Sequence, residues 1–137
     1  MKKIGIWLDK EKAHLVTLEG EKEHFKTVES DLEFYNVRGG SRSKTKWGPQ
    51  QVVQDSRYLE REKHQMRDYF DNLAEHLKSA DVISIFGPAE VKEKFAKAIS
   101  EKHPGINAKV QAVETADSMT DNQLKAMIRE HFGWERP

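Results

Sequence analysis

The chain has 137 residues, no cysteine and equal numbers of basic and acidic residues, 23 of each, so its formal net charge is zero. This length suits a single domain over residues 1–137, and the lack of cysteine excludes a disulfide scaffold, a thiolate zinc site and a cysteine nucleophile. No apolar run approaches the roughly 18 residues of a membrane span or forms a signal-peptide core. We therefore expect a cytoplasmic protein with no membrane partner.

The first thirty residues predict three antiparallel strands. Residues 3–8 (KIGIWL) alternate apolar with small or polar side chains, and residues 13–20 (AHLVTLEG) form a returning strand after a polar turn. Residues 21–30 (EKEHFKTVES) follow directly as a weaker third strand. Residues 31–56 show no helical period and are rich in Gly, Ser, Gln and charge. A loop this long inside a domain is usually either functional or disordered.

The remainder predicts helices that alternate with strands, because apolar residues recur at intervals of three and four in three segments. The expected elements are a helix from a cap at Asp55 or Ser56 to about Ser79, an apolar strand at 81–86, a helix opened by Pro88 and ending near 103–105, a strand at 107–114, and a last helix behind a Thr120–Gln123 capping box. The predicted buried stripes are Met66, Tyr69, Phe70, Leu73 and Leu77, then Val91, Phe95, Ala98 and Ile99, then Leu124, Met127, Ile128 and Phe132.

The order of elements is thus β-β-β-α-β-α-β-α with a long loop before the first helix. Three antiparallel strands followed by α/β crossovers predict an α/β fold, in which a mixed sheet carries helices on its faces. This order matches the ribonuclease H-like architecture.

The charge is unevenly distributed along the chain. Between Val37 and Arg67 eight basic residues face three acidic ones, a local charge of +5 that the rest of the chain balances. Such a segment is either a solvated basic face or a contact for an acidic partner such as a phosphate backbone. Within 36–51 (NVRGGSRSKTKWGPQQ) adjacent glycines permit close backbone approach, and a tryptophan can stack on an unpaired base.

We accordingly predict an RNA-contacting site in this loop and the first turns of the helix after it. Its residues are Arg38, Gly39, Gly40, Ser41, Arg42, Lys44, Lys46, Trp47, Arg57 and Arg61. The arginine and lysine side chains would contact phosphates, the glycines would allow close approach of the backbone, and Trp47 would stack on an unpaired nucleobase. No DNA partner, cofactor or metal is expected, and the oligomeric state is left open.

Other chemistries have weaker signals. A two-metal nuclease would need carboxylates at strand ends; Asp9 fits loosely, but Gly87-Pro88 ends the central strand where an acid is wanted. The six histidines show no HxxxH pair, and Ser118 lacks the nucleophile-elbow sequence of a hydrolase. The turn at Gly87-Pro88 is either an anion-docking helix start or simple strand-to-helix punctuation.

The loop and the following helix resemble the middle domain of the archaeo-eukaryotic peptide-chain release factors, a family that includes the Pelota-type rescue factors. That domain has the ribonuclease H-like order and carries an R-G-G-Q loop before a basic helix of the form R-x-x-x-E-x-R-H. The corresponding pieces are RGGS (38–41) and RYLEREKH (57–64).

The C-terminal half is similar to small stand-alone bacterial proteins described as translational machinery proteins, a bacterial branch of the release-factor-like family. The GPA-x-x-K turn and the VET-x-D-x-x-TD-x-QL segment carry this likeness. The resemblance covers nearly the whole chain.

The resemblance implies translation as the setting, but the decisive position differs. Ser41 stands where release factors carry the glutamine that positions the hydrolytic water. We therefore expect a non-catalytic factor associated with the ribosome or tRNA. The alternatives are a peptidyl-tRNA hydrolase with a degenerate loop, and a protein-interaction module that inherited the fold.

Overall fold

The computed structural model describes residues 1–30 and 48–135, with side chains placed in 1–30 and 63–135. Within these residues, no helix is both long and apolar enough to cross a membrane.

The described strands form one mixed sheet. They are β1 (Lys2–Leu8), β2 (Lys12–Glu19), β3 (Lys22–Glu29), β4 (Val82–Gly87) and β5 (Val110–Thr115), in the spatial order β3-β2-β1-β4-β5. The first three strands pair antiparallel, whereas β4 runs parallel to both β1 and β5. The tight turn between β2 and β3 is possible because Gly20 adopts φ 61, a conformation that glycine enters without steric penalty.

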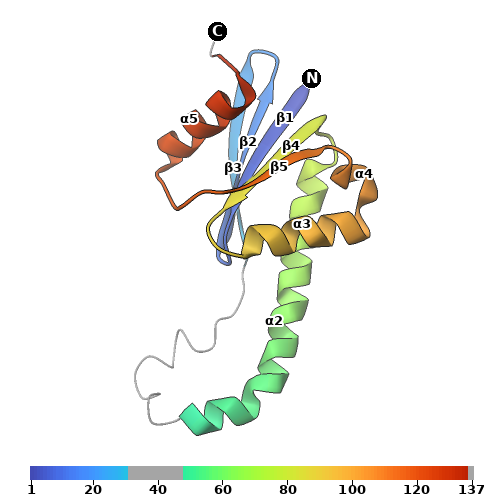
Figure 1. Ribbon diagram of the computed structural model, residues 1–137, viewed down its shortest axis with the longest axis vertical. Coiled ribbons are helices and arrows are strands. Elements are labelled where there is room, and N and C mark those ends of the chain that lie inside the picture. Colours follow the sequence, from blue (N-terminus) through green and yellow to red (C-terminus); the bar gives the residue numbers. More distant parts are fainter. Residues whose placement is uncertain (31–47, 136–137) are drawn as a thin grey trace.

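Helices cover both faces of the sheet. They are α2 (Gly48–Leu77), α3 (Val91–Lys102), the short α4 (Pro104–Asn107) and α5 (Asp121–Phe132). Figure 1 shows α5 lying apart from α2 and α3, and shows the N-terminal part of α2 extending beyond the sheet. The helices therefore divide the apolar residues of the strands into two separate clusters.

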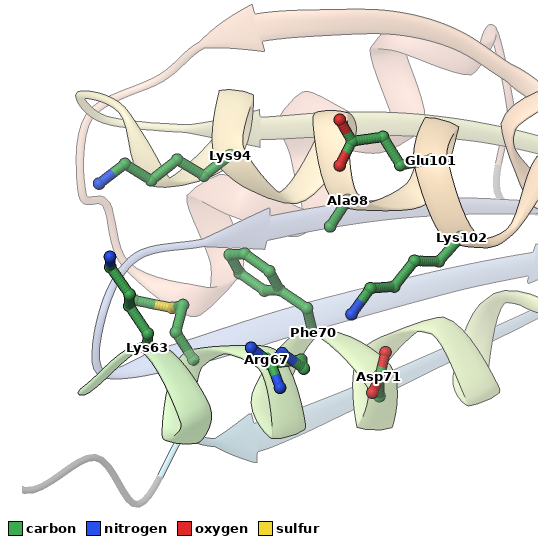
Figure 2. Close-up of a pocket in the computed structure, with 9 residues that line it drawn as sticks. Lys63, Arg67, Phe70, Asp71, Lys94, Ala98, Glu101 and Lys102 are labelled. Carbon is green, nitrogen blue, oxygen red and sulfur yellow. The ribbon is translucent and has the colours of Figure 1, made fainter. Parts of the chain in front are cut away.

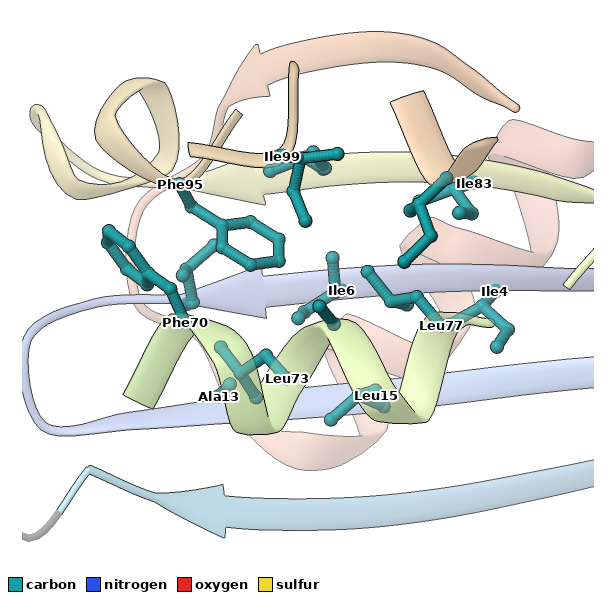
Figure 3. Close-up of a cluster of buried hydrophobic side chains, with 14 of the residues drawn as sticks. Ile4, Ile6, Ala13, Leu15, Phe70, Leu73, Leu77, Ile83, Phe95 and Ile99 are labelled. Carbon is teal, nitrogen blue, oxygen red and sulfur yellow. The ribbon is translucent and has the colours of Figure 1, made fainter. Parts of the chain in front are cut away.

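The larger cluster lies under α2 and α3 (Figure 3). Ile4 and Ile6 of β1 contribute to it together with Phe70 of α2 and Phe95 of α3, whose ring centroids lie 5.2 Å apart. Alternate residues of a strand point to opposite faces, so Trp7, which follows Ile6, belongs instead to the cluster under α5, with Leu124 and Ile128. β1 is thus buried on both sides, which the predicted alternation of apolar and small or polar residues does not indicate.

The structure confirms the predicted α/β class, with a mixed sheet flanked by helices. The Thr120–Gln123 capping box is present, with Thr120 Oγ1 accepting from the Gln123 N–H at 3.2 Å and Gln123 Oε1 accepting from the Thr120 N–H at 3.0 Å. Of the stripe predicted for α2, Tyr69, Phe70, Leu73 and Leu77 are buried and Met66 is partly buried.

Three of the element boundaries predicted from the sequence are wrong. α2 begins at Gly48, so 48–56 is helical and not loop; Pro49 lies in the first turn, where a missing N–H costs nothing. Pro88 does not open α3, because Ala89 takes φ 53 and the helix starts only at Val91. The last strand begins at Val110 and not at 107, because Pro104 opens the unpredicted helix α4.

Candidate functional site

Four connections meet at one edge of the sheet, the carboxyl ends of the parallel strands. Trp7 of β1 pairs with Phe86 of β4, and Gly87 pairs with Thr115 of β5, so these three strands end together. β3 ends at the same edge, since the Ser30 N–H donates to the Glu11 carbonyl at 2.9 Å. The chain therefore enters residues 31–47 from the edge at which open α/β sheets usually bind ligands.

Asp9, the carboxylate considered for nuclease chemistry, closes the turn between β1 and β2. Its Oδ1 accepts from the N–H groups of Glu11 at 2.8 Å and Lys12 at 2.9 Å, and its own N–H donates to the Lys12 carbonyl at 3.0 Å. Within the residues that the structure describes, no three His, Asp or Glu side chains gather in a metal-binding group. The turn accounts for an acid at this position without a metal.

Tyr69 ties α2 to this edge. Its hydroxyl donates to the Asp9 carbonyl at 3.1 Å. Burial, and secondarily the charge of Asp9, raises the pKa of Tyr69 far above its usual range, so the hydroxyl stays a donor at physiological pH. A polar cavity of about 290 Å³ lies beside it, where β3 ends, and is lined by Glu29, Ser30, Gln65, Asp68, Tyr69 and Asn72.

The turn after β4 is tightly packed. A Cβ added to Gly87 would lie 2.4 Å from the Leu8 carbonyl oxygen, so only glycine fits there without a shift of the backbone. Lys92 is 4% exposed, and its ammonium donates to the Ala89 carbonyl. The Ala116 N–H donates to the Gly87 carbonyl at 2.9 Å. These contacts give the Gly and Lys of the GPA-x-x-K sequence a role in shaping the turn.

An open groove of about 450 Å³ lies between α2 and α3. Its lining residues are Lys63, Met66, Arg67, Phe70 and Asp71 of α2, and Lys94, Ala98, Glu101 and Lys102 of α3 (Figure 2). We call this the α2–α3 groove. The four basic residues are exposed, whereas Phe70 is buried and Met66 and Ala98 are half-buried. The sequence gives no sign of this groove, because its two walls come from segments about thirty residues apart.

Most of the predicted RNA-contacting residues lie outside the described residues. These are Arg38, Gly39, Gly40, Ser41, Arg42, Lys44, Lys46 and Trp47. Arg57 and Arg61 belong to α2, within Gly48–Leu77, but the positions of their side chains are not described. The site therefore stays a prediction, located by the edge that the chain leaves after Ser30 and by the helix that follows.

A serine–histidine pair occurs where the sequence did not predict one. Ser84 Oγ lies 2.7 Å from His131 Nε2, and Gln111 Nε2 lies 3.4 Å from the same hydroxyl. Ser84 is fully buried in β4, beneath α5, so no substrate can reach its hydroxyl. The pair satisfies a buried polar group and links β4 to α5.

The fold places the chain among proteins in which a three-stranded meander continues into α/β crossovers. No protein-family model matches it, and no curated protein matches it. Among solved structures, the chain is similar to Pelota from Thermoplasma acidophilum, with a TM-score of 0.56 and 18% identity over 96% of this chain. It is also similar to Archaeoglobus fulgidus Pelota, with a TM-score of 0.57 and 13% identity over 95% of the chain.

A third similar structure is the archaeal translation termination factor aRF1, with a TM-score of 0.54 and 12% identity over 94% of this chain. The chain covers 33%, 31% and 34% of these three proteins, about a third of each. At such low identity the likeness is one of fold. It agrees with the Pelota and release-factor resemblance seen in the sequence.

Proposed function

We propose that this chain is a release-factor-like translation factor that associates with the ribosome or tRNA and contacts RNA without catalysing peptide release. The observation that carries the proposal is its likeness in fold, over nearly the whole chain, to two Pelota proteins and a translation termination factor. The RGGS sequence falls between β3 and α2 in the chain, and the RYLEREKH sequence falls within α2. These are the positions at which the resemblance expects the loop and the basic helix. We further propose a single-domain cytoplasmic protein of the small bacterial type.

The charge distribution supports RNA as the partner. Residues 36–51 contain four basic residues and no acidic one, although the whole chain has a net charge of zero. The described structure places Ser30, six residues before this segment, at the carboxyl edge of the sheet, where binding loops are usually found. A basic loop at such an edge suits a phosphate backbone better than a neutral ligand.

Ser41 supports a role without hydrolysis. A seryl hydroxyl is shorter than a glutamine side chain and lacks its paired amide donor and acceptor. The loop therefore retains the glycines and the positive charge without the group that would orient a water molecule. A release assay on stalled ribosomes checks this part: no turnover above buffer is expected, and turnover abolished by Gly40→Ala would contradict it.

Ribosome co-sedimentation at low and at moderate salt tests the RNA contact. Replacing Arg38, Arg42, Lys44 and Lys46 by Ala removes four cations. For single-stranded RNA, each cation that contacts a phosphate contributes about 0.7 to the slope of log binding constant against log salt concentration. We expect the protein to travel with ribosomes, and the quadruple variant to bind more weakly with a slope reduced by about 3.

A matched control removes the same charge elsewhere. Lys22, Lys26, Lys78 and Lys97 are all exposed, and replacing them by Ala should leave sedimentation unchanged. If both quadruple variants lose binding equally, the attraction is non-specific. If neither loses it, the loop does not contact the ribosome.

A further inference from the structure

The α2–α3 groove combines an apolar floor with a basic rim. Met66 and Phe70 of α2 and Ala98 of α3 supply the apolar part of its lining. Lys63 and Arg67 stand on one wall, and Lys94 and Lys102 stand on the other (Figure 2). The aliphatic stems of such side chains extend an apolar surface while their charged ends remain in water.

The two ends of the groove differ in charge. In Figure 2, Lys63 and Lys94 lie at one end, whereas Asp71, Glu101 and Lys102 lie toward the other. Within the described residues, Lys94 makes only a long, exposed contact of 3.9 Å with Glu90. Among the residues that line the groove, those at the end with Lys63 and Lys94 are basic, whereas the opposite end carries both signs of charge.

These features fit a peptide better than RNA. Single-stranded RNA is bound by cations together with exposed aromatic faces on which bases stack. Phe70, the aromatic residue in the lining, is 7% exposed and packs against Phe95 inside the core. An amphipathic segment instead needs apolar contacts along a groove and opposite charges at its rim. The lining residues of α3, from Lys94 to Lys102, span about 12 Å, enough to hold a helical segment of about nine residues.

We propose that the α2–α3 groove binds an acidic, amphipathic segment of a protein partner. Its apolar side chains would rest on Met66, Phe70 and Ala98, and its carboxylates would face Lys63 and Lys94. This interaction is separate from the RNA contacts proposed for residues 36–51, and either can fail without the other.

A selection from a phage-displayed library of random 12-residue peptides tests the inference. The wild-type chain should enrich peptides that combine Asp or Glu with large apolar residues. The double variant Lys63→Glu, Lys94→Glu should lose these peptides and enrich basic ones, because the charge at that end is reversed. Both lysines are exposed, and circular dichroism verifies that the variant is folded.

Affinities of one synthetic, fluorescein-labelled peptide from the enriched set make the test quantitative. We expect the double variant to weaken binding at least about tenfold, since two attractive contacts become repulsive. The control Lys97→Glu changes the charge of an exposed α3 residue that does not line the groove, and it should change the affinity less than about twofold. Ala98→Glu, which places a carboxylate in the floor, should also weaken binding.

Four results would overturn the proposal. In the first, the wild-type chain enriches no acidic, apolar peptides beyond those that the double variant also enriches. Another is an equal loss of affinity in Lys97→Glu. In the third, a 12-nucleotide single-stranded RNA displaces the peptide and loses affinity in the same double variant, which would assign the groove to RNA. In the fourth, the chain forms a dimer that the double variant separates, which would assign the groove to a second copy.

Discussion

The contact between β1 and α5 leads to a quantitative prediction at Gly5. A Cβ added there would lie 2.6 Å from Ile128 Cγ2, 2.9 Å from Cδ1 and 3.0 Å from Cγ1. Ile128 is 0% exposed, so it cannot turn away into solvent. Overpacking of this kind costs about 1–3 kcal/mol. Reduced freedom of the unfolded chain offsets about 0.4–1 kcal/mol of that.

We therefore expect Gly5→Ala to lower the free energy of unfolding by about 1–2 kcal/mol, measured by urea denaturation with unchanged slope. Ile128→Ala alone should cost about 2–5 kcal/mol, because it leaves a cavity. The double variant should be more stable than the sum of the two losses predicts, because the new Cβ then occupies space that Ile128 has left. Additivity within about 0.5 kcal/mol would show that Gly5 and Ile128 do not pack together, and would refute the reasoning.

Three further substitutions test individual contacts. Asp9→Ala should lower the free energy of unfolding in urea by about 1–2 kcal/mol, because two backbone N–H groups lose their acceptor. An unchanged urea midpoint would show that Asp9 does not stabilise the turn. Ala89→Gly should raise the melting temperature, because glycine adopts φ 53 without the penalty of about 1 kcal/mol that a Cβ carries, and a lower melting temperature would contradict this. Burial lowers the pKa of His14, so the unfolded chain takes up the proton first, and stability should fall as pH drops below about 6.5 toward the folded-state pKa. His14→Phe keeps an aromatic ring between Trp7 and Phe25 and should make the pH dependence over this interval shallower, which urea titrations at pH 5 and 7 can detect.

Local signals in the sequence were enough for most of the fold. The Thr120–Gln123 box needs only residues three apart, and the spacing of Leu73 and Leu77 defines a buried helical stripe without reference to other elements. The start of α2 was missed because residues 48–56 have no apolar period to reveal a helix. The start of α3 was missed because the left-handed conformation of Ala89 is not marked by a glycine.

Contacts between distant segments were beyond sequence reasoning. The pair of Ser84 and His131 joins residues 47 apart, and the α2–α3 groove forms only when Lys63 and Lys94 come to face each other across two helices. The candidate RNA site has the opposite character. Its positive charge and its glycines are visible in the sequence, whereas most of its residues lie outside the part of the chain that the structure describes.

A photocrosslink from the loop tests the RNA contact most directly. A benzophenone side chain placed at Trp47 should crosslink, on illumination with purified ribosomes and tRNA, to a product that ribonuclease degrades. The same group at Lys97, exposed on α3, should give no such product. An RNA crosslink from position 47 and none from position 97 is the result we predict. Equal crosslinking from both positions, or none from position 47, would contradict an RNA-contacting loop.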